Sequence, residues 1–360
     1  MNLDIHEDIR QAWTPTSRLY TDPEIYQKGI ESILARSWQW IGTDDLVKVP
    51  NQVHPITLLE GSLDEPLLVT RDAQDHVHCL SNVCTHRGNL VAEGSGIERF
   101  LRCRYHGRRF GLDGKFQHMP EFEGCAGFPS ESDNLPEVPF GFWKNHLFAG
   151  VRPFAPLKDV LADMEARVGW LPIDQFVPEP TKTRDYMVRG NWALYVENYL
   201  EGFHIPFVHA SLAEALVYDD YRTELFPHSV LQVGVGQGGD EVFDLPAEHP
   251  DQGQAISAYY WWVFPNLMFN FYPWGMSVNV VRPLGAERTR VSFIGFVGDP
   301  SRMRQGVGAD LDRVEREDEA IVEAVQVGLH SRFYDRGRYS PKRETGTHHF
   351  HRLLAKFLAD

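Results

Sequence analysis

Two short arms of the sequence, each with one cysteine and one histidine, carry residue types that bind metals. Cys84-x-His86 stands in the first arm, and Cys103-x-x-His106 follows after sixteen intervening residues in the second. Thiolate and imidazole groups are ligands for zinc and also for iron–sulfur clusters. The way the residue types are paired therefore has to distinguish between these two kinds of site.

The alternation of ligand types favours an iron–sulfur cluster. Zinc fingers usually pair cysteine with cysteine and histidine with histidine, whereas each arm here offers one of each. In a Rieske 2Fe–2S cluster one iron takes two thiolates and the other takes two imidazoles, so each arm reaches both irons. Gly88 and Gly107 follow the ligands and allow the backbone to approach a cluster closely. We therefore predict a Rieske cluster, with structural zinc as the alternative.

A second group of candidate ligands lies in "NWALYVENYLEGFHIPFVHASL", residues 191–212. Two histidines and one carboxylate are the expected ligands of an iron that keeps positions open for oxygen. The segment predicts a helix up to Pro206. His204 and His209 lie about 140° apart around such a helix, so both can face one metal only if the helix breaks or widens between them, and Pro206 is expected to break it. Glu201 precedes His204 by three residues and is expected on the same face, close to the metal.

The carboxylate ligand is expected from "ADLDRVEREDEAIVEAVQVGL", residues 309–329, which predicts an amphipathic helix. Helical phase selects Asp318, because this residue completes a stripe along one face. The other members of that stripe are Leu311, Val314, Ile321 and Val325. The opposite, solvated flank is predicted to hold Glu315, Glu319 and Glu323. An inward aspartate needs a metal ion or an arginine such as Arg313 or Arg316. Glu317 is the alternative ligand.

At these residues the sequence resembles a known family. "CTHRGN" and "CRYHG" are similar to the Rieske domain in the large catalytic (alpha) subunits of non-heme iron oxygenases, and the resemblance covers nearly the whole chain. Glu201 inside "NYLEGFH" resembles the branch that acts on choline, carnitine, glycine betaine and similar quaternary amines. The implied fold class is α+β, with an all-β Rieske domain at 45–155 and a helix-grip (START-like) catalytic domain at 156–360. A helical segment, 1–44, is expected to pack on the catalytic domain.

The resemblance also implies cofactors, partners and residue roles for this oxidoreductase, a monooxygenase or dioxygenase. The implied metal ligands are Cys84, His86, Cys103 and His106 for the 2Fe–2S cluster, and His204, His209 and Asp318 for a mononuclear Fe(II). Dioxygen is the implied co-substrate, and electrons are expected from NAD(P)H through a separate reductase or ferredoxin. The family forms three-fold rings, so a homotrimer is expected. Glu201 matches the bridge between His106 of one subunit and His204 of the next.

Two features set the cluster region apart from some related proteins. Many members of the family have tryptophan where Arg108 follows "YHG", and this departure affects the surroundings of the cluster or the docking face. High-potential Rieske proteins of respiratory complexes usually carry a disulfide through a second cysteine beside each ligand pair, and no such cysteine stands here. The remaining cysteines, Cys79 and Cys125, are predicted to be small apolar core residues.

Composition and the remaining motifs bear on the binding partners, the location and the loops of the protein. A formal net charge of −15 disfavours nucleic acid, and 42% hydrophobic residues can build a core. No apolar run is long enough for a membrane span and no secretory signal is visible, so a cytoplasmic location is expected. "GVGQGGD", residues 234–240, resembles a dinucleotide-binding loop, but no helix pattern follows, which favours a strand end and loop. Residues 238–254 are polar and acidic and predict an exposed loop.

The segment richest in aromatic residues, "AYYWWVFPNLMFNFYPWG" at 258–275, bears on the substrate. Aromatic cages hold quaternary ammonium ions, although alternating aromatic residues are also common in the cores of sheets. The candidate cage residues are Tyr260, Trp262, Phe271 and Trp274. The predicted reaction is hydroxylation of a quaternary or tertiary methylamine, which causes N-demethylation or C–N cleavage. The alternatives are ring hydroxylation or O-demethylation of an aromatic compound, and a non-catalytic electron-transfer or binding protein, which the second metal site disfavours.

Overall fold

Two units make up the part of the chain that the structure describes. The structure, a computed structural model, describes residues 3–209, 220–236, 241–303 and 311–359. Residues 35–157 form one unit, called here the small unit, and the residues before and after it form the large unit. Among the described residues, no helix is long and apolar enough to cross a membrane.

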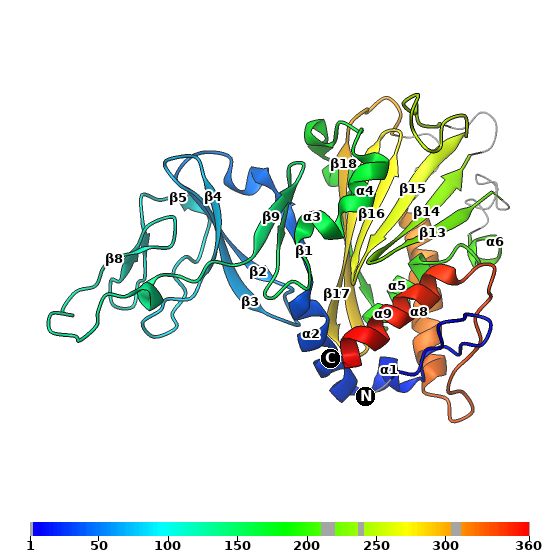
Figure 1. The fold of residues 1–360 in the computed structure, drawn as a ribbon, viewed down its shortest axis with the longest axis horizontal. Helices are drawn as coiled ribbons and strands as arrows, with labels where there is room; N and C mark the ends of the chain where they lie inside the picture. Colours follow the sequence, from blue (N-terminus) through cyan, green and yellow to red (C-terminus); the bar gives the residue numbers. More distant parts are fainter. Residues whose placement is uncertain (1–2, 210–219, 237–240, 304–310, 360) are drawn as a thin grey trace. The chain divides into compact units, whose positions relative to one another are not determined.

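The small unit is built from short antiparallel strands (Figure 1). They are β1 Gln39–Thr43, β2 Gln52–Leu58, β3 Glu65–Arg71, β4 Val77–Ser81, β5 Gly96–Ile97, β6 Leu101–Arg102, β7 Arg109–Phe110, β8 Phe116–His118, β9 Phe140–Trp143 and β10 His146–Ala149. They form three sheets with the orders β4-β3-β2-β5, β6-β7-β8 and β1-β10-β9. Inward-facing apolar residues from the first two sheets form one core cluster, which also contains Cys84 and Cys103. The sheets therefore hold both candidate ligand thiols away from water.

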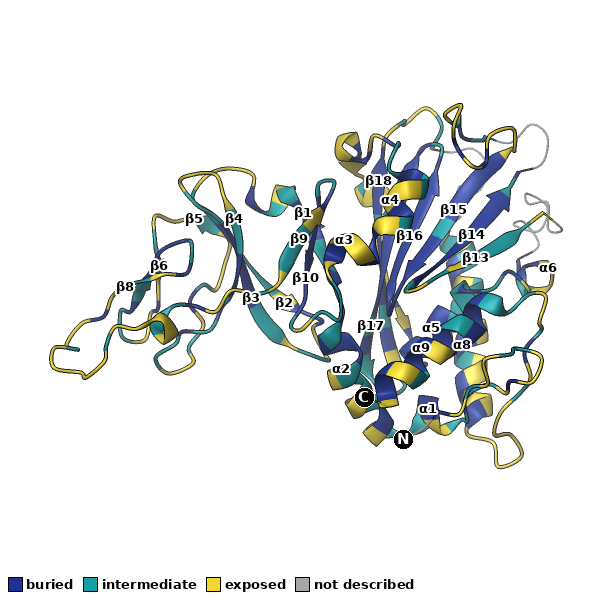
Figure 2. Ribbon diagram, in the orientation of Figure 1, coloured by how far each residue is buried: buried dark blue, intermediate teal, exposed yellow. Residues whose placement is uncertain are grey.

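The large unit is organised around an eight-stranded antiparallel sheet. Its strands are β11 Val177–Pro178, β12 Arg184–Val188, β13 Arg222–Phe226, β14 Ser229–Val235, β15 Ile256–Val263, β16 Leu267–Tyr272, β17 Gly275–Gly285 and β18 Arg288–Val297. The order is β11-β18-β17-β16-β15-β14-β13, and β12 also pairs with β18. The central strands are buried almost throughout, as Figure 2 shows in dark blue, because side chains are packed on both faces of the sheet.

The described α-helices lie mostly in the large unit, and several of them contact strands of this sheet. They are α1 Arg18–Thr21, α2 Pro23–Ser32, α3 Leu157–Val160, α4 Ala162–Val168, α5 Trp192–Tyr199, α6 Ile205–Val208, α8 Leu311–Leu329 and α9 Thr345–Ala359. Asn191 begins α5, because its side chain accepts a hydrogen bond from the Ala193 N–H. Helix α9 packs on the sheet face that carries Trp262, whose ring centroid lies 5.3 Å from that of Phe350.

The segment after β14 differs from its predicted character as an exposed loop. Strand β14 ends at Val235, as predicted, and residues 237–240 lie outside the described part. Asp251, however, is only 2% exposed and accepts hydrogen bonds from Arg167 of α4 and from the Tyr259 hydroxyl, both at 2.7 Å. A buried carboxylate needs such partners, and here they fix the segment to the sheet face opposite α9.

The two cysteines outside the ligand arms behave differently from each other. Cys79 is buried in the core of the small unit, as predicted, and burial raises the pKa of its thiol to about 12. Cys125 is exposed, which contradicts the predicted core position. The reason is that Cys125 lies in an irregular segment between β8 and β9, which contributes no strand to the core.

His146 on β10 is buried and is held in its neutral form. Trp40 Nε1–H donates to His146 Nδ1 at 3.0 Å, so this ring nitrogen must keep its lone pair. Burial lowers the pKa of His146 from 6.5 to about 4. A protonated ring would have no acceptor for the tryptophan N–H, so the hydrogen bond and the burial both favour the neutral form of His146.

We expect the small unit to lose stability as the pH falls from about 6.5 to about 4. In this window the unfolded chain binds a proton at His146 and the folded chain does not, which removes about 3 kcal/mol of unfolding free energy. The check compares unfolding free energies of the wild type and His146→Gln, which keeps an acceptor for Trp40, at both ends of the window. The wild type should lose more stability than the variant. Equal losses in both proteins would contradict the role of His146.

Candidate metal centres

The two cysteine–histidine arms of the small unit fold into matching turns. In the loops 84–89 and 103–108, the cysteine carbonyl accepts a hydrogen bond from the glycine four residues later, at 3.0 Å in both. The cysteine N–H donates to the carbonyl five residues later, at 2.8 Å in the first loop and 2.9 Å in the second. Gly88 and Gly107 have φ of +72° and +77°, which favours glycine at both positions. We call these segments the first and second ligand loops.

The four donors of these loops separate into a thiol pair and an imidazole pair. Cys84 and Cys103 are each 2% exposed and share one core cluster, whereas the rings of His86 and His106 are half-buried, with centroids 4.7 Å apart. Among the described residues, these donors do not form a group whose ligand atoms all lie within 4.8 Å of one another. One tetrahedral zinc ion would require such a group, so the arrangement fits a two-iron cluster better.

The chain around the second candidate site turns earlier than the sequence predicts. Helix α5 ends at Tyr199, well before Pro206, and Pro206 lies in the first turn of the separate short helix α6. The Glu201 carboxylate accepts hydrogen bonds from the backbone N–H groups of Phe203 and His204, which fixes the turn between the two helices. The expected single helix broken at Pro206 is therefore wrong, although the required break is present.

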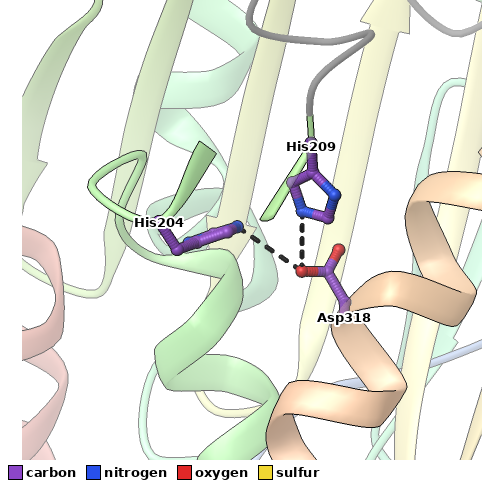
Figure 3. A group of neighbouring side chains, drawn as sticks. All are labelled: His204, His209 and Asp318. Carbon is purple, nitrogen blue, oxygen red and sulfur yellow. Dashed lines mark hydrogen bonds and ion pairs between the residues drawn. The ribbon is translucent and has the colours of Figure 1, made fainter. Parts of the chain in front are cut away.

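Three predicted ligands, His204, His209 and Asp318, come together at this turn (Figure 3). One donor atom from each lies within 4.8 Å of the others. His204 Nε2 is 3.4 Å from Asp318 Oδ1, and His209 Nε2 is 2.9 Å from the same oxygen. Both imidazoles therefore direct Nε2 towards one point, where a metal ion with two histidine ligands and one carboxylate ligand would bind.

The other ring nitrogen of each histidine contacts a glutamate. His204 Nδ1 lies 2.6 Å from Glu201 Oε1, and His209 Nδ1 lies 2.8 Å from Glu317 Oε2. Such carboxylates orient a metal-binding imidazole and keep the proton on Nδ1, which leaves the Nε2 lone pair for the metal. Glu317, the alternative ligand from the sequence, thus lies behind His209 instead of facing Asp318. Sequence reasoning missed this orienting role, because only the three-dimensional position of His209 reveals it.

The charges of this site suit a cation. Burial opposes a positive charge on His204, but the carboxylates of Asp318 and Glu201 outweigh it and raise the pKa of His204 to about 9. Burial also opposes the charged form of Asp318, yet hydrogen bonds with both imidazoles leave its pKa lowered. Glu317 also pairs with Arg313, so Glu201 and Asp318 supply the negative charge that a divalent metal ion would balance. The residues present therefore fit a mononuclear iron.

Helix α8 brings Asp318 to this site in a phase that differs from the predicted stripe. Ile321 and Val325 are 39% and 43% exposed, and the side chain of Leu311 lies outside the described part. The fully buried members of the helix are Glu315, Val322, Gln326 and Leu329. Glu315 was expected in solvent, but it accepts a hydrogen bond from the Tyr195 hydroxyl at 2.7 Å, and burial raises its pKa well above the usual range. Asp318 lies on the edge of the observed stripe, so the prediction selected it for a partly wrong reason.

The four candidate cage residues are not brought together. Phe271 pairs with Tyr259, which places it on the sheet face opposite Tyr260, and Trp262 packs against α9. Tyr260 and Trp274 do belong to one cluster around Ile205, the residue after His204. Sequence reasoning missed two further members of this cluster, Tyr221 and Tyr272. Tyr272 lies two residues before Trp274 and fits the same alternation, a signal that the choice of Phe271 passed over, whereas Tyr221 is distant in sequence.

Comparison with known proteins identifies the chain. Residues 37–129 match the Rieske [2Fe-2S] domain, and residues 173–360, more than half of the chain, match the ring hydroxylating alpha subunit (catalytic domain). The two matches, which together span most of the chain, are thus those of a Rieske non-heme iron oxygenase. Within this class the chain belongs to the ring-hydroxylating alpha-subunit family. The predicted family and enzyme class are confirmed.

Several relatives and solved structures resemble nearly the whole chain. Chloroplastic choline monooxygenase of Arabidopsis thaliana is 31% identical over 96% of this chain and 83% of the relative. The carnitine monooxygenase oxygenase subunit of Escherichia coli (strain K12) is 26% identical over 98% and 95%. The quaternary ammonium Rieske monooxygenase CntA in complex with L-carnitine gives a TM-score of 0.77, with 23% identity and 99% of each chain covered. Naphthalene 1,2-dioxygenase from Rhodococcus sp. gives 0.75, with 18% identity over 96% and 95%. These structures confirm the predicted α+β fold class.

Proposed function

We propose that this protein is the oxygenase component of a monooxygenase that hydroxylates a small quaternary or tertiary methylamine next to nitrogen. The group formed by His204, His209 and Asp318 carries this proposal, because it has the ligand types of an oxygen-using iron. Relatives along nearly the whole chain are choline and carnitine monooxygenases, which supports an amine substrate.

We assign each metal to the residues that fit it. Cys84, His86, Cys103 and His106 would hold the 2Fe–2S cluster, and His204, His209 and Asp318 would hold Fe(II). When bound, the cluster passes single electrons and the iron activates dioxygen. Glu201 and Glu317 hold the Nδ1 protons of the two histidines and thereby keep both Nε2 atoms directed at the site.

The proposed reaction balances as a monooxygenation. One atom of dioxygen enters a C–H bond beside nitrogen, and the other leaves as water after two electrons and two protons are taken up. If the oxidised carbon belongs to an N-methyl group, the hydroxymethyl product releases formaldehyde and the demethylated amine. If it belongs to a longer substituent, the C–N bond breaks and that substituent leaves as an aldehyde. The electrons would come from NAD(P)H through a separate reductase or ferredoxin.

The surroundings of the iron site favour a cationic substrate. Aromatic rings of the cluster around Ile205 could contact a quaternary ammonium group, which cannot donate a hydrogen bond. Trp274 already stacks on Tyr272, with centroids 5.0 Å apart, and lies 5.5 Å from the Lys182 ammonium.

The less buried members of this aromatic cluster are the best candidates for the substrate contact. Tyr221 and Tyr260 are half-buried, whereas Tyr272 and Trp274 are almost fully buried. A ring must present an open face to a cation, which favours the first pair. We therefore assign Tyr221 and Tyr260 to the ammonium group, in place of the cage predicted from strand alternation.

We further propose that the protein works as a homotrimer in which electrons cross between subunits. Glu201 contacts His204 through one carboxylate oxygen, and in an assembly it could also contact His106 of the partner subunit. Such a shared carboxylate would couple the cluster of one chain to the iron of the next. The Nδ1 contact and the partial exposure of His106 support this assignment.

The test is a single turnover with labelled dioxygen. The purified, iron-loaded protein is reduced chemically and exposed to ¹⁸O₂ with a mixture of choline, carnitine, glycine betaine and simple aromatic compounds. Borohydride is added at once, so that a labelled aldehyde is trapped as an alcohol before it exchanges oxygen with water. Label in an alcohol derived from an amine is expected. Label confined to a phenol would overturn the amine proposal in favour of aromatic hydroxylation, and no label from any compound would overturn both.

A further inference from the structure

Arg108, the residue that ends the second ligand loop, is an unusual buried cation. It is 2% exposed and its guanidinium carbon lies 5.1 to 5.8 Å from the ring centroids of three phenylalanines. These are Phe110, Phe116 and Phe128. Within the part of the chain that the structure describes, its Nε–H has no hydrogen-bond partner. A charge in such surroundings is costly unless a counter-ion is close, so its retention calls for an explanation beyond packing.

The counter-ion of Arg108 is Asp133, and Asp133 contacts both ligand loops. Arg108 forms an ion pair with the Asp133 carboxylate and also donates to the Asp133 carbonyl oxygen at 3.4 Å. The same carbonyl oxygen accepts a hydrogen bond from the Thr85 hydroxyl at 2.8 Å. Thr85 lies between the two donors of the first ligand loop. One residue therefore connects a side chain of the first loop with a side chain of the second.

The position of Asp133 is itself fixed. Its second carboxylate oxygen accepts from the Ser130 N–H at 2.7 Å and from the Ser130 hydroxyl at 3.0 Å. All four cysteines of the chain are free, so no disulfide joins the two loops. The Thr85–Asp133–Arg108 link, called here the polar clasp, makes the connection between the loops that a disulfide would otherwise make.

We propose that Arg108 is a positioning residue for the cluster, which ties the second ligand loop to the first through Asp133 and raises the reduction potential with its buried charge. Reduction adds one negative charge to the cluster, and a fixed cation in a low-dielectric surrounding stabilises the reduced form more than the oxidised form. The inference rests on the proposed assignment of Cys84, His86, Cys103 and His106 as the cluster ligands.

The test measures the midpoint potential of the cluster in the full-length, cluster-loaded protein by a spectroscopic redox titration. Arg108→Gln removes the cation and should lower the ratio of reduced to oxidised cluster at a fixed potential by roughly tenfold. This change corresponds to a midpoint potential lower by about 59 mV. Asp133→Asn removes the anion and should shift the potential in the opposite direction. Arg108→Lys retains the charge and should stay near the wild type. Arg104→Gln is the matched control, because Arg104 belongs to the same loop but is exposed.

The rate of cluster release is a second readout, which distinguishes the structural effect of the polar clasp from the electrostatic effect of the Arg108 charge. Weakening the ion pair from either side should speed release of the cluster to an iron chelator, so Arg108→Gln and Asp133→Asn should change this rate in the same direction. Their potentials should change in opposite directions, which a purely structural role would not produce.

Potentials that shift in the same direction in Arg108→Gln and Asp133→Asn, or by no more than in Arg104→Gln, would overturn the inference. If Arg108→Gln loses its cluster during purification, Asp133→Asn and Arg108→Lys still test the inference, because both retain the cation. Asp133→Asn should raise the potential, and Arg108→Lys should leave it near that of the wild type. A wild-type protein without a Rieske spectrum would overturn the ligand assignment, and the inference with it. A wild-type spectrum without charge-dependent shifts would overturn the inference alone.

Discussion

Asp318→Ala is expected to remove the mononuclear iron and to lower turnover by more than about 100-fold, the upper range for residues that only support a ligand. Asp318 Oδ1 is the atom that both histidine Nε2 atoms face, so its loss removes the carboxylate from the ligand set. The visible spectrum of the cluster should persist, because the cluster residues belong to the other unit. The measurements are iron content, cluster absorbance and substrate-dependent oxygen consumption.

Two variants on the same helix make this prediction specific. Asp312→Ala removes an aspartate that pairs with Arg184 and Arg316 instead of a histidine, and it should leave iron content unchanged. Glu317→Ala removes the partner of His209 Nδ1 together with the Arg313 ion pair, and it should weaken iron binding by about 10- to 100-fold without abolishing it. Equal loss of iron in all three proteins would indicate damage to helix α8 and would count against Asp318 as a ligand.

Glu201→Gln is expected to slow electron transfer from cluster to iron by about 10- to 100-fold while both metals stay bound. The glutamine oxygen can still accept the His204 Nδ1 proton. The amide has no negative charge and only one acceptor oxygen, so it cannot accept from two imidazoles through separate oxygens as a carboxylate would. Stopped-flow reoxidation of the reduced cluster, with substrate and oxygen present, measures this step. Iron and cluster contents are measured on the same samples.

The outcome of the Glu201 experiment separates a bridge from a structural role. The Glu201 carboxylate also accepts backbone N–H groups at the turn before α6, so a purely structural role predicts loss of iron together with loss of activity. A bridge predicts full iron content and slow reoxidation. Normal reoxidation at full iron content would argue against the bridge between subunits.

The ligand arms could be predicted from the sequence because short loops determine the local geometry. Cys84-x-His86 and Cys103-x-x-His106 each fold into one turn whose hydrogen bonds stay within six residues. Spacing along the chain therefore corresponds closely to spacing in three dimensions. The glycines required at positive φ also appear directly in the sequence.

Helix α8 shows where such reasoning stops. Its apolar residues Ile321 and Val325 suggested the buried face, yet they are partly exposed, while the acidic Glu315 is buried against Tyr195. Periodicity assumes that burial follows hydrophobicity, and a site built from carboxylates violates this assumption. The helix α9 has an amphipathic pattern as well, but three histidines interrupt it near its beginning and the prediction missed it.

Partners that come from distant segments could not be predicted. Asp133 lies 25 residues after Arg108, and Glu317 lies 108 residues after His209, so no local pattern connects them. The same holds for Tyr221 beside Ile205. Each of these contacts depends on how strands and helices pack, which single-sequence periodicity does not specify.

Iron content per chain tests the central claim most directly, namely that one chain holds a Rieske cluster and a separate iron. The account predicts about three irons in the wild type, about two in Asp318→Ala with the Rieske spectrum intact, and about one in Cys103→Ser with that spectrum lost. A wild type that never binds more than two irons, with no change in Asp318→Ala, would contradict it and would leave an electron carrier without an oxygen-using site.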